Sequence, residues 1–264
     1  MPLKPKLGQN FLRDMNAAER IAGALGDCAS RTVIEIGAGR GAITGALAAR
    51  AAHVVAVELD RELAADLRMR FQQERVTIAE QNVLHYDFAR TAAQAGGRLL
   101  VAGNLPYYIT SPILLKLAAS HAALELAVLM VQREVADRVT AAPGSRDYGL
   151  LSVNVQMYGA VDPLFTLPPS AFFPPPQVHS TVIRWRFAPR FAELGIEEDA
   201  FQRFLRQVFA QKRKTLLNNL RAAGIPPPAI GSALAQLGIE QRTRAEALQI
   251  ETLASLWLAL EGKK

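Results

Sequence analysis

The sequence predicts an α/β protein in two parts: a mostly parallel sheet with helices on both faces, and a small all-helical domain that follows it. Two observations predict this fold class. Short apolar segments alternate with segments of helical spacing as far as about residue 190, which is the pattern of βαβ units. From Glu197 onward every segment has helical spacing. We therefore expect a first domain over residues 1–192 and a helical domain over 193–264.

The apolar segments of the first part have the length of strands. They cover residues 32–37, 53–60, 75–83, 98–102, 125–132 and 181–187, and Gly103 is expected to break the fourth of them. Helical spacing covers residues 14–27, with Asp14 or Asn16 as its cap, then 42–51 and 63–71. Ligands of such sheets bind beyond the carboxyl ends of the strands, so the loops after the strands are the candidate sites.

Composition indicates the partners and the cellular compartment to expect for this protein. Lys and Arg exceed Asp and Glu by 30 to 24 in 264 residues, a surplus compatible with an RNA partner without requiring one. Cys28 is the only cysteine, so no intrachain disulfide can form and a reducing compartment is expected. No secretory signal and no membrane-spanning segment are predicted, which places the protein in the cytoplasm. The four histidines lack metal-ligand spacing, so no metal site is predicted.

A glycine-rich loop at residues 35–41 lies between a predicted strand and a predicted helix, and Glu58 ends the next strand. Glycines such as Gly37 and Gly39 let a ligand approach the backbone, while a carboxylate accepts hydrogen bonds from ribose hydroxyls. The pattern fits a nicotinamide dinucleotide or S-adenosylmethionine, and a tight structural turn is the plainer alternative. Glu35 favours S-adenosylmethionine, because its aminoacyl end needs polar contacts.

The segment Asn-Leu-Pro-Tyr-Tyr at 104–108 follows another strand. The Asn104 side-chain oxygen and the Leu105 carbonyl, held by Pro106, can accept hydrogen bonds from an exocyclic amine, and Tyr107 can stack on the base that carries it. Accepting these hydrogen bonds aims the amine lone pair at a methyl donor, so positioning supplies the catalysis. The alternative is a turn in which Asn104 caps a helix near residue 111. Tyr108 is expected only to pack.

A second aromatic face is predicted at residues 172–178, where prolines stiffen an extended segment. A base inside folded RNA must be extruded and held between two faces, and Phe172 is the expected partner of Tyr107. The alternative is that Phe172 fills core space. Exposed cations for RNA phosphates are expected at Arg206, Lys212, Arg213, Lys214 and Arg221, although a solvated helix end would look the same.

Several segments together resemble one family over essentially the whole chain, the small-subunit (16S) ribosomal RNA adenine dimethyltransferases. They are GQNFL (8–12), EIGAGRGAIT (35–44), VELD (57–60), NLPYYIT (104–110), the Phe172–Val178 segment, SRDYGLLSV (145–153) and KRKTLLNNL (212–220). The resemblance implies a Rossmann-like S-adenosylmethionine-dependent methyltransferase sheet with a C-terminal helical RNA-binding domain. It also implies cofactor contacts at Gln9, Asn10, Leu12, Gly37, Gly39, Glu58, Asn82 and Asn104.

The same resemblance implies a substrate. The expected enzyme dimethylates two adjacent adenines in the 3′-terminal hairpin loop of small-subunit ribosomal RNA, within an assembling 30S-type subunit, and acts as a monomer. One departure concerns Asn82, because the family usually has an Asp there to accept a hydrogen bond from the cofactor's adenine. An amide oxygen can keep this role without charge, and we expect modestly weaker binding.

Three other functions fit parts of the pattern. A large-subunit ribosomal RNA adenine dimethyltransferase shares the fold and the chemistry, but the 104–107 segment and the long helical tail favour the small-subunit substrate. A binding protein that has lost activity is disfavoured because Glu58, Asn104, Pro106 and Tyr107 are all present. A nicotinamide dehydrogenase fits the glycine loop alone.

Overall fold

The structure, a computed structural model, describes residues 10–261. The described chain divides into two compact units. The first contains residues up to 136 together with 160–188, and the second contains 137–159 together with the chain from 189 onward. This division differs from the expected boundary at 192/193, because a segment from the middle of the sequence belongs with the C-terminal helices.

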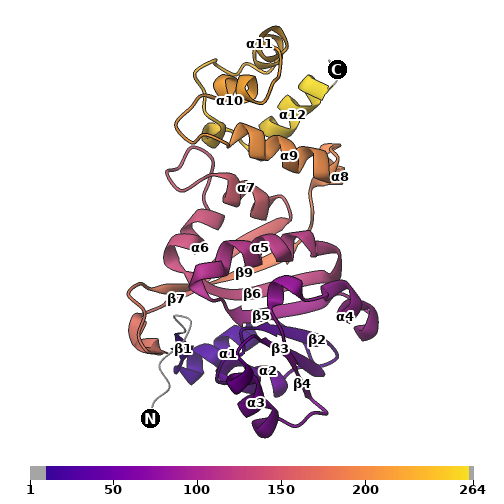
Figure 1. Ribbon diagram of the computed structural model, residues 1–264, viewed down its shortest axis with the longest axis vertical. Coiled ribbons are helices and arrows are strands. Elements are labelled where there is room, and N and C mark those ends of the chain that lie inside the picture. The colour runs from indigo at the N-terminus through magenta and orange to yellow at the C-terminus, as the bar shows by residue number, and fades with distance from the viewer. Residues whose placement is uncertain (1–9, 262–264) are drawn as a thin grey trace. The chain divides into compact units, whose positions relative to one another are not determined.

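The first unit contains a seven-stranded sheet with the strand order β4-β3-β2-β5-β6-β9-β7 (Figure 1). The expected parallel arrangement holds for β2 to β6, and β9 pairs antiparallel with β6. Strand β7 lies outside every segment expected from the sequence. The bounds are Thr32–Ile36 (β2), His53–Glu58 (β3), Val76–Glu80 (β4), Leu99–Asn104 (β5), Leu124–Gln132 (β6), Gly159–Leu167 (β7) and Ser180–Phe187 (β9).

Gly103 does not break its strand, contrary to expectation. Strand β5 continues to Asn104, and Gly103 pairs with Ile36 of β2. A β-carbon at Gly103 would lie 2.5 Å from the backbone oxygen of Ile36, closer than real β-carbons come. The glycine therefore keeps β5 and β2 close together up to the loop at Asn104.

Helices cover both faces of this sheet, and the strand order explains why. The order runs outward from β2 to β4 and then returns to β5, so the direction of the right-handed crossovers reverses at the junction of β2 and β5. One face buries the apolar side of α1 to α3 against alternate strand residues such as Val54 and Leu100. The helices are Met15–Gly23 (α1), Ala42–Ala48 (α2), Arg61–Arg70 (α3), Phe88–Ala95 (α4), Thr110–Ala119 (α5) and Arg133–Val139 (α6).

A separate two-stranded ribbon joins the N-terminal segment to the proline-rich segment. Strand β1 (Phe11–Leu12) pairs antiparallel with β8 (Phe172–Phe173). Leu12 lies opposite Phe172, and Phe11 lies opposite Phe173. Because directly opposed residues share one face of an antiparallel pair, the two pairs point to opposite sides of the ribbon.

The second unit is helical. It contains α7 (Leu150–Gln156), α8 (Phe191–Leu194), α9 (Glu198–Val208), α10 (Leu216–Ala222), α11 (Pro227–Gln236) and α12 (Ile250–Glu261). Its core buries Phe201, Leu205, Leu220, Leu234 and Leu253. Single turns of 3₁₀-helix occur at Val83–His85 (η1), Tyr107–Ile109 (η2), His121–Ala123 (η3), Pro169–Ala171 (η4) and Ala245–Ala247 (η5). None of the helices within residues 10–261 combines the length and the apolar character needed to cross a membrane.

Candidate active site

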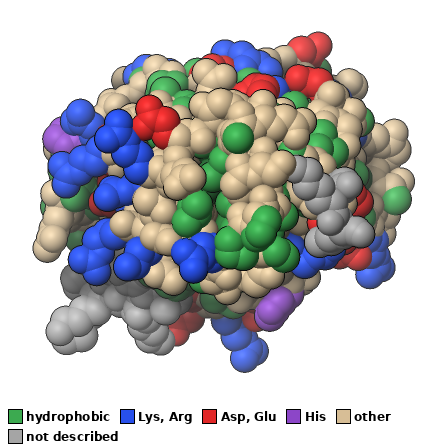
Figure 2. Space-filling model, turned by 90° about the horizontal axis from the view of Figure 1, so that it is seen from above, with side chains coloured by type: hydrophobic (Ala, Val, Ile, Leu, Met, Phe, Trp, Pro, Cys, Tyr) green, Lys and Arg blue, Asp and Glu red, His purple; other side chains and the backbone are tan. Residues whose placement is uncertain are grey.

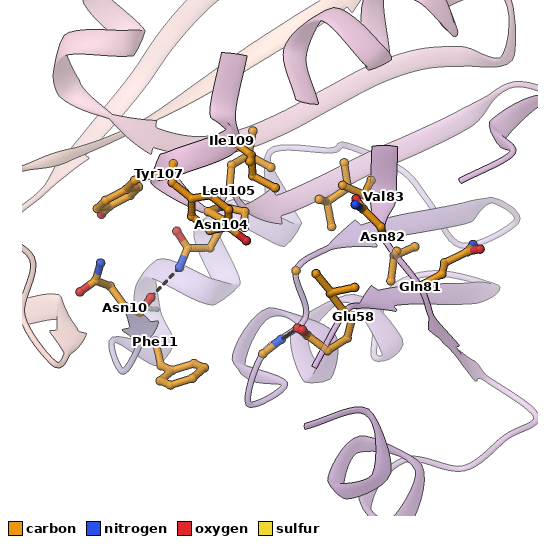
Figure 3. A pocket seen from close by; sticks show the side chains of 17 residues that line it. Asn10, Phe11, Glu58, Gln81, Asn82, Val83, Asn104, Leu105, Tyr107 and Ile109 are labelled. Carbon is orange, nitrogen blue, oxygen red and sulfur yellow. Dashed lines mark hydrogen bonds between the residues drawn. The ribbon is translucent and has the colours of Figure 1, made fainter. Parts of the chain in front are cut away.

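A pocket in the first unit lies beyond the carboxyl ends of β2, β3, β4 and β5, on both sides of the point where the strand order reverses. Figure 3 shows residues from these loops and from β1 converging on one space. Parallel sheets place ligand sites at this position because adjacent crossovers diverge there. The lining residues are Asn10, Phe11, Ile36, Gly37, Gly39, Val57, Glu58, Leu59, Gln81, Asn82, Val83 and residues 104–109.

Glu58 is positioned by two backbone donors. One carboxylate oxygen accepts a hydrogen bond from Gly39 N at 2.8 Å, and the other accepts one from Asp60 N at 2.9 Å. Gly39 has a left-handed backbone at φ +55°, which favours glycine. Each Glu58 oxygen keeps a further lone pair, so the carboxylate can accept hydrogen bonds from two ribose hydroxyls.

Glu35 does not line the pocket, contrary to the polar contact expected of it. Its side chain is 1% exposed and accepts a hydrogen bond from the Thr44 hydroxyl at 2.5 Å. Burial raises its pKa to about 7, while the Thr44 hydrogen bond opposes that shift. Glu35 therefore ties strand β2 to helix α2 behind the glycine loop.

Asn82 follows strand β4 and lines the pocket next to Gln81. Its side-chain oxygen accepts a hydrogen bond from Leu84 N at 3.0 Å and so caps η1. One lone pair of that oxygen is thus used within the loop, and one remains for a ligand. Gln81 lies outside the set expected from the sequence, although its position next to Asn82 after a strand could have indicated it.

Asn104 ends strand β5 and joins the N-terminal segment to the pocket. Its amide nitrogen donates a hydrogen bond to the Asn10 carbonyl at 2.9 Å (Figure 3). Its amide oxygen is buried and has no hydrogen-bond partner within residues 10–261. Asn104 does not cap helix α5, so the alternative weighed for it is wrong. A buried oxygen without a donor is a natural acceptor for a ligand amine.

The loop after Asn104 is held by several hydrogen bonds. Leu105 N donates to Met130 O at 3.0 Å, and the buried Thr110 hydroxyl donates to Pro106 O at 3.1 Å. Tyr107 is half-buried, and its hydroxyl lies 2.7 Å from the Ser180 hydroxyl, which holds the far end of its ring in place. Tyr108 was expected only to pack, but it is 58% exposed and lines the pocket.

Two expected site residues lie in the core instead. Phe172 is 2% exposed and Leu12 is 7% exposed, and both belong to the cluster that covers one face of the sheet. Phe172 therefore offers no open face to a base in this structure, and the core alternative describes it. Their ribbon neighbours differ: Phe11 lines the pocket, and Phe173 is 46% exposed. The spacing of the prolines could not distinguish Phe172 from Phe173, because the pleat decides which ring is buried.

The remaining expected residues have these positions. Gly37, Gly39, Glu58, Asn82 and Asn104 line the pocket, as do Asn10 and residues 105–107, whereas Gln9 lies outside the described residues. Arg206, Lys212, Arg213, Lys214 and Arg221 are exposed on the second unit. In the described part of the chain, no three His, Cys, Asp or Glu side chains gather as a metal site would require.

The three clustered cations Lys212, Arg213 and Lys214 form a turn between α9 and α10 rather than a helix end; we refer to residues 211–214 as the basic turn. Asn219 anchors it: the buried Asn219 amide donates to Val208 O at 2.8 Å and to Gln211 O at 3.3 Å. Figure 2 shows Lys and Arg side chains gathered along one side of the face that it draws.

Comparisons with known proteins agree on a single group. A profile of the ribosomal RNA adenine dimethylase family matches residues 2–261. The ribosomal RNA small subunit methyltransferase A of Acidobacterium capsulatum is 57% identical over 98% of this chain and 92% of its own length. The protein of the same name from Koribacter versatilis is 49% identical over 96% of this chain and 93% of its own length.

Two solved structures have a similar fold. A dimethyladenosine transferase from Plasmodium falciparum superposes with a TM-score of 0.81 at 24% identity, covering 96% of this chain and 98% of the other. The 23S rRNA methyltransferase ErmE superposes with a TM-score of 0.72 at 24% identity, covering 96% and 100%. These likenesses confirm the expected fold class, a methyltransferase sheet followed by helices.

Proposed function

Because the chain belongs to the ribosomal RNA adenine dimethylase family, we propose that it methylates the 6-amino groups of two adjacent adenines in the 3′-terminal hairpin loop of small-subunit ribosomal RNA. The methyl donor is S-adenosylmethionine, which supplies an electrophilic methyl group on a sulfonium. The buried oxygen of Asn104, which has no partner within residues 10–261, is the observation that carries the proposal.

The pocket fits this cofactor by the chemistry of its donors and acceptors. Glu58, held by two backbone N–H groups, would accept hydrogen bonds from the ribose hydroxyls. Asn82 and Gln81 follow the neighbouring strand, where they would contact the adenine. Of the loop after β2, only Gly37 and Gly39 line the pocket, so no side chain of this loop keeps the aminoacyl end from the backbone.

The 104–107 loop would orient the target amine. The lone pair of an adenine amine is delocalised into the ring, so the amine is a weak nucleophile until it is held out of conjugation. Two acceptors, Asn104 Oδ1 and the Leu105 carbonyl, would take its two hydrogens and direct the lone pair to the methyl group. Tyr107, whose hydroxyl contacts Ser180, would provide a face on which the base stacks.

The substrate would be recognised within an assembling small subunit, by a monomer in the cytoplasm. Two observations support the substrate in this finer proposal. The relatives at 57% and 49% identity are both small-subunit methyltransferases by name. The exposed cations of the basic turn suit RNA phosphates, and the second unit that carries them is the proposed RNA-binding part.

Mass mapping of methylated adenines tests the proposal. Small subunits lacking the modification, and large subunits as a control, are incubated with the protein and S-adenosylmethionine. We expect dimethyladenine at two neighbouring positions of the small-subunit RNA only. Methylation of large-subunit RNA instead would favour the rival substrate, and RNA binding without methyl transfer would favour an inactive binding protein.

Asn104→Ala examines the role of the loop. The variant loses an acceptor used in the transition state, so we expect methyl transfer to fall by about 10²–10³-fold. RNA affinity, measured by filter binding, should stay within about twofold because the basic turn is unchanged. Full activity of Asn104→Ala would remove the mechanism proposed for this loop.

A further inference from the structure

The N-terminal strand lies directly against the reactive loop. Asn10 and Phe11 line the same pocket as Asn104, and Phe11 is held there from several sides. The Arg40 guanidinium lies 4.7 Å from the centre of the Phe11 ring, and Phe11 pairs with Phe173 across the ribbon. A β-carbon at Gly39 would lie 3.2 Å from the Phe11 ring, so the ring packs closely on the glycine loop. The backbone at Asn10 is therefore fixed relative to the pocket.

An asparagine side chain can occupy its site in two orientations that exchange its oxygen and its nitrogen. Only one of them suits the Asn104 site. The Asn10 carbonyl can only accept a hydrogen bond, so the group that faces it at 2.9 Å must be the Asn104 amide nitrogen. The oxygen is then turned to the side on which Tyr107 lies (Figure 3). Reversing the amide would turn the Asn104 oxygen towards the Asn10 carbonyl, so that two acceptors faced each other. It would also present the Asn104 nitrogen, a donor, to the target amine.

We propose that the Asn10 backbone carbonyl is a positioning group, which orients the Asn104 amide so that its oxygen, and not its nitrogen, meets the target amine. This inference rests on the proposed function, because it concerns the acceptor of that amine. It assigns a role to the main chain of the N-terminal strand that is independent of the Asn10 side chain.

The first test is a direct measurement on the unmodified protein. NMR spectra of protein labelled with ¹⁵N-asparagine report hydrogen exchange of each side-chain amide, and Asn104→Ala assigns the Asn104 signal. We expect one Asn104 amide proton to be protected, as for the buried Asn219 amide that donates to Val208 O at 2.8 Å. Asn218, on the exposed side of α10, provides the rapidly exchanging reference. Exchange of both Asn104 protons at the Asn218 rate would overturn the proposal.

The second test uses Asn104→Asp. An ionised Asp keeps the acceptor but cannot donate to the Asn10 carbonyl, whereas a protonated Asp can do both. We therefore expect the methyl-transfer rate of this variant, divided by the parent rate at the same pH, to rise up to about tenfold for each unit of decreasing pH until the carboxyl is protonated. The ratio removes effects common to both proteins. The other ionisable groups around the site are Glu58, Tyr107, Tyr108 and the buried Glu35, and the cations beside β1 are Arg13 and Arg40.

Asn82→Asp is the matched control. The same change is made in the same pocket, but Asn82 accepts from Leu84 N at 3.0 Å through its oxygen, and an ionised Asp keeps that bond. Its activity ratio should not rise as the pH falls. A flat ratio for Asn104→Asp, including no activity at any pH, would overturn the orienting role. If the parent protein failed to methylate the RNA, the proposed function would be wrong. The hydrogen-exchange measurement would still show whether the Asn104 amide donates to the Asn10 carbonyl.

Discussion

Two buried carboxylates at the glycine loop differ in their hydrogen-bond partners. Glu58 is 5% exposed and receives a backbone N–H on each oxygen, so its side chain is held in place. Glu35 is 1% exposed and its side-chain donor is the Thr44 hydroxyl. Desolvation raises the pKa of Glu35 to about 7, and the charge of Glu58 adds to this shift. Glu35 therefore weakens the folded state when it ionises.

The pH dependence of stability should show this effect. The folded pKa of Glu35, about 7, lies above its unfolded value of about 4.5. Its ionisation therefore leaves the free energy of unfolding unchanged below pH 4.5 and lowers it by the full penalty above pH 7. That penalty is at most roughly 3 kcal/mol. We expect Glu35→Gln to reduce the loss of stability between pH 5 and pH 7. Denaturant unfolding of both proteins without cofactor measures it, and parallel pH curves would contradict the assignment.

Asn82 occupies the position at which the resemblance to the small-subunit ribosomal RNA adenine dimethyltransferases implies an Asp. Its oxygen accepts the η1 cap hydrogen bond and keeps one lone pair for a ligand, and an Asp would add a second, charged acceptor. We expect Asn82→Asp to bind S-adenosylmethionine equally well or up to about tenfold more tightly by calorimetry. Gln73→Glu, which adds the same charge at an exposed position outside the pocket, is the control and should not improve binding. A large loss of affinity in Asn82→Asp would exclude the proposed adenine contact.

Among the elements, the β1–β8 ribbon decides which of two adjacent rings is accessible. Leu12 and Phe172 point into the core, whereas Phe11 and Phe173 share the other face, and Phe11 lines the pocket. We propose that Phe173 is the second aromatic contact for the base, in place of Phe172. The Arg13 guanidinium lies 5.7 Å from the centre of the Phe173 ring, which adds a cation beside it.

Replacing each ring separately should distinguish their roles. Phe172→Ala leaves a cavity in the core, so we expect it to lower the free energy of unfolding by about 3–5 kcal/mol. Phe173→Ala removes an exposed ring, so its stability should change by less than about 1 kcal/mol while KM for RNA rises. Denaturant unfolding and steady-state kinetics measure the two effects. A stable Phe172→Ala with impaired methyl transfer would restore the original prediction for Phe172.

At the scale of the whole molecule, charge is expected to control RNA affinity. The chain carries a net charge of +6, and the basic turn concentrates three of its cations on the second unit. RNA binding releases counterions from the phosphates that the protein contacts. The slope of log affinity against log salt is therefore proportional to the number of phosphates contacted. The Asn219 side-chain amide donates to the carbonyl of Val208, the last residue of α9, and to that of Gln211 in the turn. These two hydrogen bonds keep the cations in a defined turn.

Changing Lys212, Arg213 and Lys214 together to Ala should therefore lower the slope of log affinity against log salt by up to about 3. The control changes Arg50, Arg68 and Arg75 to Ala, which removes the same charge from exposed positions of the first unit. That control should leave the slope nearly unchanged. Equal effects of the two triple variants would mean that net charge, rather than the basic turn, governs RNA binding.

The sequence alone determined most of the order of strands and helices, with β7 the exception, and it also determined the loops that carry the chemistry and the family. Alternation of apolar segments and glycines at strand ends are local signals, so they predicted Glu58 and Asn104 correctly as pocket residues. The tertiary structure alone decided which side chains reach the pocket. It buried Phe172, Leu12 and Glu35 and exposed Tyr108, because orientation in a pleated ribbon or a loop depends on pairing with distant segments. The contact of Asn10 with Asn104 spans 94 residues, and no local pattern encodes it.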